Sequence, residues 1–190
     1  MTHIAIVVGS LREQSFNRRL ARALVKLAPS SVTFSWPDIG NLPLYDQDDD
    51  EDQADPVKTF KAAIQAADAV VFVTPEYNRS IPGVLKNAID HASRPYGKSA
   101  WRGKPAGILG VSPGILGTAL AQQHLRNVLS VLDMPTMSQP EAYVRWDEGL
   151  LVQVEENDEV LREDSAAFLR NWLARFLEFV AQVQAGRAVK

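Results

Sequence analysis

Short, continuously apolar segments alternate along the chain with longer segments in which apolar residues recur every three or four positions. The segments at residues 4–8, 32–34, 69–73 and 106–109 are apolar and rich in β-branched side chains, and polar residues or glycine bound them. Such runs are typical of strands buried on both faces of a sheet. A fifth, short strand is expected near residues 135–137. The apolar pattern therefore predicts five strands.

Helical periodicity follows each predicted strand. Ser15 is a candidate N-cap for the first helix, and Pro56 and Pro82 stand at the starts of the second and third. A fourth helix is expected from residue 118 to about residue 132, and a terminal helix carries an apolar stripe that we interpret as core packing. The stripe consists of Phe168, Leu169, Trp172, Leu173, Phe176, Leu177 and Val180.

The alternation of strands and helices predicts the fold class. Parallel strands joined by right-handed helical crossovers form a three-layer α/β sandwich, and a five-stranded parallel sheet fits the flavodoxin-like order 2-1-3-4-5. No internal repeat or domain boundary is visible, so we expect residues 1–190 to form a single domain. Ligands of such sheets bind beyond the carboxyl ends of the strands, which directs attention to the loops after strands 1, 3 and 4.

Composition and charge narrow the function classes. The formal net charge of -3 gives no general affinity for a phosphate backbone, so no nucleic-acid partner is expected. The count of Cys 0 excludes disulfides, zinc ribbons and thiol nucleophiles, and it suits a cytoplasmic protein. No apolar run approaches the ~20 residues that span a bilayer, and no signal peptide is visible. Because the chain has no cysteine thiols, any redox chemistry needs a bound cofactor.

The loop after the first strand, residues 9–17, can hold an anion. It places hydroxyl groups, an amide and the guanidinium of Arg12 at a helix N-terminus, where unpaired N–H groups and the helix dipole favour negative charge. It is neither a Walker A loop nor a GxGxxG fingerprint, which argues for one terminal phosphate and against a pyrophosphate. A capped helix with a surface arginine is the alternative interpretation.

The loop after the third strand, residues 74–83, combines an aromatic residue and an amide between prolines. Such a loop is stiff, and it can present backbone donors and an aromatic face to a planar ligand. A purely structural turn would not need so many specific groups. This loop is therefore a second candidate for the ligand site.

The loop after the fourth strand, residues 110–117, matches G-x-S-x-G with Ser112 in the position of a hydrolase nucleophile. Pro113 lacks the backbone N–H that an oxyanion hole would need, and no acidic residue lies between Ser112 and His124, the only downstream histidine. Serine hydrolysis is therefore a weak alternative. A close approach of the backbone to a flat ligand explains the glycines better.

The remaining candidates are weaker. The acidic run at residues 46–55 has no EF-hand spacing, and we interpret it as a solvated loop with no metal. His3, His91 and His124 lack metal-ligand spacing and are expected to be structural. The four tryptophans are candidates for the mouth of a ligand site or for an interface: Trp36, Trp101, Trp146 and Trp172. The first of these to consider is Trp101, which precedes the fourth strand.

Several of these motifs together resemble one known family. The chain is similar to the NAD(P)H-dependent FMN reductases, in their quinone and chromate reductase branch, over roughly residues 4–143. The motifs that carry the resemblance are Gly9-Ser10-Leu11-Arg12, Ser15-Phe16-Asn17, Thr74-Pro75-Glu76-Tyr77-Asn78, Ser80, Pro82-Gly83, Leu85-Lys86-Asn87-Ala88-Ile89-Asp90, His124-Leu125-Arg126 and Pro140-Glu141. Arg79 departs from the pattern, since several relatives carry an aromatic residue there, and residues 146–159 match the family poorly.

The resemblance implies a bound FMN and assigns its contacts. The residues expected to hold the phosphate are Ser10, Arg12, Ser15 and Asn17, with Leu11 and Phe16 beside them in the same loop. The residues expected to contact the isoalloxazine and ribityl chain are Pro75, Glu76, Tyr77 and Asn78, with Ser112 and Gly114 closing the other edge. No catalytic side chain is implied, because flavin N5 carries the chemistry.

The activity that the resemblance implies is two-electron transfer from NAD(P)H to a quinone or similar acceptor, such as chromate, an azo compound or free flavin. A single domain of this length leaves no room for a separate nicotinamide domain, so donor and acceptor share one flavin face and ping-pong kinetics are expected. Relatives assemble as homodimers or homotetramers, and the same is expected here. A flavodoxin-like FMN electron carrier, without its own NAD(P)H turnover, is the alternative function.

Overall fold

A computed structural model describes residues 1–155 and 158–188 of the chain. Its main sheet has five strands in the order β2-β1-β3-β4-β5, and every neighbouring pair is parallel. This order confirms the flavodoxin-like prediction. The strands are β1 (Thr2–Val8), β2 (Val32–Ser35), β3 (Ala69–Val73), β4 (Ala106–Ser112) and β5 (Ala142–Arg145).

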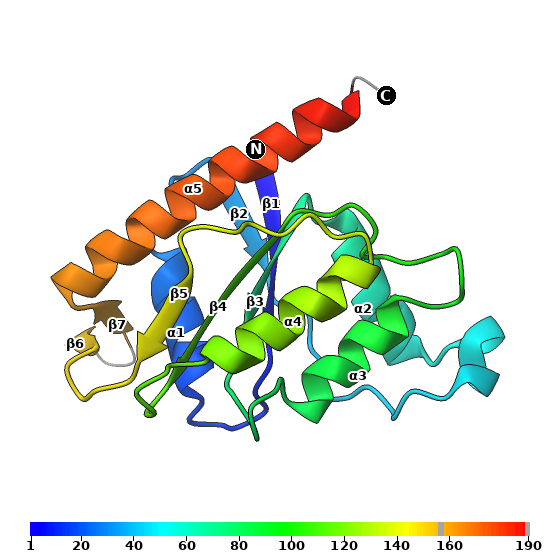
Figure 1. Cartoon of the computed structure of the whole chain (residues 1–190), viewed down its shortest axis with the longest axis horizontal. Helices are drawn as coiled ribbons and strands as arrows, with labels where there is room; N and C mark the ends of the chain where they lie inside the picture. The colour runs from blue at the N-terminus through cyan, green and yellow to red at the C-terminus, as the bar shows by residue number, and fades with distance from the viewer. Residues whose placement is uncertain (156–157, 189–190) are drawn as a thin grey trace.

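Helices cover both faces of this sheet, as Figure 1 shows. Side chains alternate along β1: Ile4 and Ile6 pack into the core shared with α1 and α5, whereas Ala5 and Val7 pack into the core shared with α2, α3 and α4. The three-layer prediction is therefore confirmed. The helices are α1 (Phe16–Val25), the 3-10 helix η1 (Gln47–Asp52), α2 (Asp55–Ala66), α3 (Gly83–Ala92), α4 (Ala119–Val131) and α5 (Glu163–Ala188).

The terminal helix packs as its apolar stripe predicts, except at Phe168, which is partly exposed. Trp172 and Phe176 are fully buried against the sheet. Gly107 in β4 permits this close packing, because a Cβ atom there would lie 2.8 Å from Cη2 of Trp172. None of the helices in the described ranges combines the length and the apolar character that crossing a membrane requires.

The predicted fifth strand at residues 135–137 is wrong. That segment makes one isolated bridge, between Thr136 and Ala106 at the start of β4, and then leaves the sheet. The fifth strand is β5, which pairs with the other end of β4 from Leu109↔Ala142 to Ser112↔Arg145. The edge of the sheet is thus built from two separate pieces of the chain.

Two further boundaries differ from the expectation. Strand β4 continues through Ser112, so residues 110–112 are strand and the loop is shorter than predicted. An antiparallel hairpin, β6 (Leu151–Glu155) and β7 (Asp158–Leu161), lies between β5 and α5 and was not anticipated. It occupies much of the segment that matches the family poorly, of which residues 156 and 157 lie outside the described ranges.

Trp101 does not lie at a ligand mouth or an interface, so this expectation is wrong. Its side chain is fully buried between Phe60 and Phe72, with ring centroids 5.9 and 5.7 Å away. The indole N–H donates to the carbonyl of Ile89 at 2.9 Å. A buried tryptophan whose N–H finds a backbone acceptor is part of the core.

Candidate functional site

The loops after β1, β3 and β4 meet at one edge of the sheet. Figure 1 shows them together at the lower edge, opposite the two chain termini. Backbone hydrogen bonds hold the first residues of these loops side by side. The N–H of Gly9 donates to the carbonyl of Val73 at 2.9 Å, and the N–H of Thr74 donates to the carbonyl of Leu109 at 3.0 Å. The structure therefore brings together the three segments that the sequence singles out.

The loop after β1 leads into a capped helix N-terminus. The hydroxyl of Ser15 accepts from the backbone N–H of Arg18 at 3.2 Å, which confirms Ser15 as the N-cap of α1. Ser10 is buried near the end of β1, while Arg12 is exposed at the outer part of the loop. The first turn of α1 has no acidic residue. Buried hydroxyls, an exposed guanidinium and a helix dipole together form a site suited to an anion.

Asn17 ties the first loop to β4. Its amide nitrogen donates to the carbonyl of Val111 at 2.9 Å, and its amide oxygen accepts from the N–H of Val111 at 3.0 Å. The amide has two N–H groups, so one remains for a ligand. Asn17 thus fixes the start of α1 against the sheet, and its contact with a phosphate stays a prediction.

The loop after β3 closes in a tight turn at residues 77–80. Tyr77 and Ser80 exchange both backbone hydrogen bonds, at 2.9 and 3.0 Å. The two central residues, Asn78 and Arg79, have positive φ values of 51° and 66°, as a type I′ turn requires. Asparagine adopts this conformation readily, whereas arginine does so only under strain. The turn therefore holds Arg79 in a fixed position at the site.

Glu76 caps the helix on the other side of the site. Its Oε2 accepts from the backbone N–H groups of Leu120 and Ala121, at 3.0 and 3.1 Å, in the first turn of α4. The hydroxyl of Thr118, at the N-cap position, instead accepts from the side chain of Gln122 at 2.9 Å. Glu76 therefore links the β3–α3 loop rigidly to α4, and the sequence gives no signal for this contact between residues 44 positions apart.

Ser112 is not arranged as a nucleophile. Its hydroxyl donates to the carbonyl of Gly117 within its own loop. His124, the only downstream histidine, is hydrogen-bonded to Ser80 through Nδ1 at 2.7 Å. Without an activating base at Ser112, the serine hydrolase alternative has no structural support.

Apolar side chains are exposed at this edge of the sheet. Tyr77 is 48% exposed, Ile115 is 84% exposed, and Leu11 and Leu116 are about half exposed. They come from the three loops that meet there. A gathering of exposed apolar groups around polar donors suits a planar aromatic ligand or the surface of a partner.

A cavity of about 530 Å³ adjoins this surface. Its walls are Arg79 from the tight turn and Ala119, Leu120, Gln123 and His124 from the first two turns of α4. The volume falls in the range of ordinary small-molecule sites. An apolar wall beside a guanidinium and an imidazole can accept a flat ligand that carries a negative oxygen.

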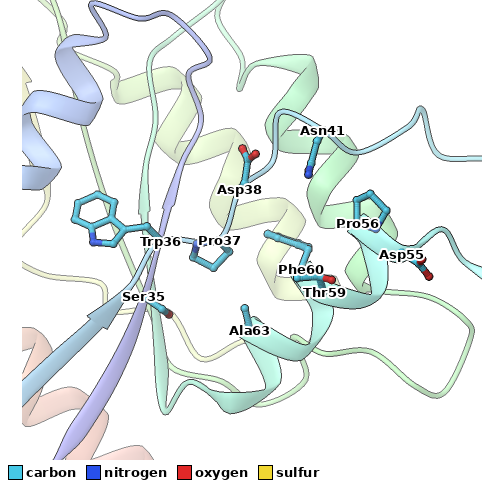
Figure 2. A pocket seen from close by; sticks show the side chains of 10 residues that line it. All are labelled: Ser35, Trp36, Pro37, Asp38, Asn41, Asp55, Pro56, Thr59, Phe60 and Ala63. Carbon is cyan, nitrogen blue, oxygen red and sulfur yellow. The ribbon is translucent and has the colours of Figure 1, made fainter.

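Figure 2 shows a second cavity, of about 520 Å³, on the β2 side of the fold. Pro37 and Phe60 form part of its lining, together with Asp38 and Asn41 of the β2–α2 connection. The carboxylate of Asp38 accepts from the backbone N–H of Gly40 at 2.9 Å. This cavity includes none of the residues that the sequence proposes for a cofactor.

His3 and His91 make hydrogen bonds within the fold, and the acidic run lies at the surface. Among residues 1–155 and 158–188, no group of three histidine or acidic residues is placed to hold a metal ion. The acidic run holds η1, whose residues are mostly exposed. His3 is bonded to Ser35 at 2.9 Å, and His91 to the carbonyl of Pro43 at 2.8 Å.

Trp146, one of the four tryptophans that the sequence proposes for a ligand mouth or an interface, lies beside the first loop. It follows β5, and its ring stacks on Phe16, the first residue of α1, with centroids 4.0 Å apart. Arg19 lies against the same indole and pairs with Glu159 of β7, and this hydrogen bond lowers the pKa of Glu159. The sequence names Trp146 as a candidate but does not indicate its contacts with Phe16 and Arg19.

Comparisons with known proteins agree on one family. The family model described as NADPH-dependent FMN reductase matches residues 2–148. A 2-hydroxy-1,4-benzoquinone reductase of Burkholderia sp is 50% identical over 177 residues, which is 93% of this chain and 95% of that protein. A quinone reductase of Pseudomonas putida is 48% identical, over 93% of this chain and 94% of that protein.

Solved structures extend this similarity. FerB, a flavoenzyme NAD(P)H:(acceptor) oxidoreductase from Paracoccus denitrificans, superposes with a TM-score of 0.89 at 42% identity, over 96% of this chain and 98% of that one. A flavodoxin from Pseudomonas aeruginosa superposes with a TM-score of 0.56 at 19% identity, over 96% of this chain and 99% of that one. The second similarity concerns the fold alone.

Proposed function

The chain belongs to the NADPH-dependent FMN reductase family, and we propose that it holds FMN at the loops after β1, β3 and β4 to pass two electrons from NAD(P)H to a quinone. The observation that carries this proposal is the meeting of the three loops beside the N-terminus of α1, where a helix dipole favours an anion. Chromate, azo compounds and free flavin are further acceptors that the same site could serve. The 1–190 chain acts as a single FMN-binding domain in this proposal.

The first loop suits the phosphate of FMN. Ser10 and Ser15 are buried hydroxyls at the start of α1, and Arg12 has the reach and the planar donor geometry for phosphate oxygens. The remaining N–H of Asn17 completes the set of donors. Leu11, half exposed beside them, offers apolar contact to the rest of the cofactor.

The other two loops suit the ring system. Pro75, Tyr77 and Asn78 lie on the rigid β3–α3 loop, where Glu76 fixes them against α4. Ser112 and Gly114, at the end of β4 and in the loop after it, form the opposite edge. An aromatic face and fixed backbone donors are what an isoalloxazine needs for stacking and hydrogen bonding.

Bound FMN supplies the hydride and electron chemistry, so the side chains need only bind, orient and exclude water. The stiff turn at Asn78 and Arg79 and the capped α4 keep the walls of the site fixed while nicotinamide and quinone occupy it in turn. No acid or base is required from the protein. This suits a site whose one imidazole, His124, is bonded to Ser80.

We also propose a homodimer or homotetramer and a cytoplasmic location. The exposed Ile115 and Leu116, next to the half-exposed Tyr77, supply apolar surface for an interface at the site. The count of Cys 0 suits a reducing compartment.

The proposed function is tested by the absorbance spectrum of the purified protein before and after anaerobic NADH or NADPH. We expect FMN absorbance that is bleached by the nicotinamide and restored by a quinone. Because donor and acceptor share one site, initial rates in double-reciprocal plots should give parallel lines, as in ping-pong kinetics. Intersecting lines would contradict the shared site, and FMN that NAD(P)H does not reduce would favour the electron carrier.

Arg79 should set a preference for acidic quinones. Replacing Arg79 with glutamine removes the positive charge from the cavity wall, so kcat/KM for an ionised hydroxybenzoquinone should fall about 3- to 10-fold relative to that for neutral benzoquinone. Arg79→Lys is the matched control, because it keeps the charge and bears the same positive φ of 66°. Equal losses for both quinones would show that Arg79 acts on the shape of the turn and not on charge.

A further inference from the structure

Aromatic and cationic side chains form a continuous series of contacts from the first loop to the β6–β7 hairpin. The Cζ of Arg12 lies 5.4 Å from the centroid of the Phe16 ring. Phe16 stacks on Trp146, with centroids 4.0 Å apart and ring planes 18° apart. The Cζ of Arg19 lies 4.5 Å from the centroid of the Trp146 ring. We call these four side chains the stack.

The far end of the stack is firmly anchored. The backbone N–H of Trp146 donates to the carbonyl of Ser112 at 2.9 Å, which continues the β4–β5 pairing. Arg19 donates from Nε to Oε2 of Glu159 at 2.9 Å, in a two-point ion pair with β7. Lys26 also donates to the carbonyl of Glu159, at 2.7 Å. Trp146 is therefore held by the main sheet, and the hairpin holds the arginine beside it.

The other end of the stack is Arg12, the side chain that gains most from being positioned. Arg12 is an exposed, long side chain, and such a side chain loses considerable freedom when a ligand fixes it. Contact with the Phe16 ring restricts the guanidinium before any ligand arrives. A group that is already in place for its ligand binds with a smaller entropy cost.

We propose that Trp146 is a positioning residue for the FMN phosphate: through Phe16 it holds the guanidinium of Arg12 beside the N-terminus of α1. This inference rests on the proposed function and deepens it. It assigns a role to a residue in the segment that matches the family poorly, and it makes the phosphate site depend on β5 and the hairpin as well as on the first loop.

The test compares FMN with riboflavin, which has the same ring system and lacks the phosphate. Trp146→Leu should raise the Kd for FMN about 5-fold and change the Kd for riboflavin by less than about 2-fold, by fluorescence titration of the flavin-free protein. Trp146→Phe should restore most of the FMN affinity, because an aromatic ring can still stack on Phe16. If Trp146 had only a structural role, Trp146→Leu would weaken the binding of both flavins equally.

A double-mutant cycle then links the effect to Arg12. In the absence of the guanidinium there is nothing for Trp146 to position, so Trp146→Leu should cause no further loss of FMN affinity when Arg12 is already alanine. Additive losses, or equal losses for both flavins, would overturn the inference. If Trp146→Leu does not fold, Phe16→Leu breaks the same stack and should give the same FMN-specific loss.

The outcomes also separate this inference from the proposed function. A wild-type protein that binds neither flavin would refute the function itself. A wild-type protein that binds FMN more tightly than riboflavin, with a ratio that Trp146→Leu leaves unchanged, would refute only the role of Trp146.

Discussion

Replacing Arg12 with alanine should weaken FMN binding by about 1.5–3 kcal/mol, or roughly 10- to 150-fold in Kd. The guanidinium is the only positive side chain in the loop between β1 and α1, and a charge-assisted contact with a dianionic phosphate is among the strongest a surface site can make. Removing it leaves the hydroxyls of Ser10 and Ser15 and the dipole of α1, so binding should persist at reduced affinity.

Isothermal titration of the flavin-free variant with FMN and with riboflavin measures this effect. Riboflavin affinity should change little, because the lost contact is to the phosphate. Arg22→Ala is the matched control: it removes a guanidinium from the last turn of α1, far from the loop that holds Arg12, and it should leave FMN affinity within about 2-fold. Unchanged FMN affinity in Arg12→Ala would mean that the first loop does not bind the phosphate.

The strands that carry this site can be predicted from the sequence because they are buried on both faces. Residues 4–8 and 69–73 are continuous apolar runs that no exposed helix or loop would contain, and they pair as β1 and β3 from Ile4↔Ala69 to Val8↔Val73. Once those strands are parallel, their carboxyl ends must lie at one edge, so the general location of the site follows. This is why periodicity alone predicts that three loops meet at one edge of the sheet.

The edge of the sheet is harder to predict. Residues 135–137 and β5 are both short, and each pairs with one end of β4: Met137 donates to Ala106 at 2.9 Å, whereas Val144 lies opposite Val111. A period-two pattern over three or four residues cannot distinguish a single bridge from a strand. The β6–β7 hairpin escapes prediction for a related reason: Val152 and Val154 of β6 are about half exposed, and among the described residues of the hairpin only Leu151 and Leu161 are buried in the core.

Side-chain partners across the fold are the least predictable part of the site. The sequence identifies Asn17 and Glu76 as polar groups in the right loops, yet their partners, Val111 and the first turn of α4, lie 94 and 44 positions away. Tertiary geometry alone determines which backbone groups a side chain can reach. The sequence therefore singles out Asn17 and Glu76 as candidates, but it does not predict that they fix the loops to β4 and α4.

Gly110→Ala should destabilise the protein by about 3 kcal/mol, which lowers Tm by roughly 6–12 °C for a chain of this size. A Cβ atom at Gly110 would lie 2.1 Å from the carbonyl oxygen of Thr74 and 2.3 Å from Oγ1 of Thr118. The first is a backbone atom that cannot rotate away, and the N–H of Thr74 is itself bonded to Leu109 at 3.0 Å. Relief of the clash must separate β4 from the end of β3.

Thermal unfolding of the flavin-free protein, followed by circular dichroism, measures this loss. Gly83→Ala is the matched control, since a Cβ atom there would have no neighbour within 4 Å and Gly83 begins α3, so Tm should stay the same or rise slightly. The displaced Thr74 precedes the loop that we assign to the flavin ring, so Gly110→Ala should lower the affinity for FMN and for riboflavin equally. Arg12→Ala, in contrast, should lower the affinity for FMN alone. An unchanged Tm in Gly110→Ala would mean that β3 and β4 can move apart without loss of stability.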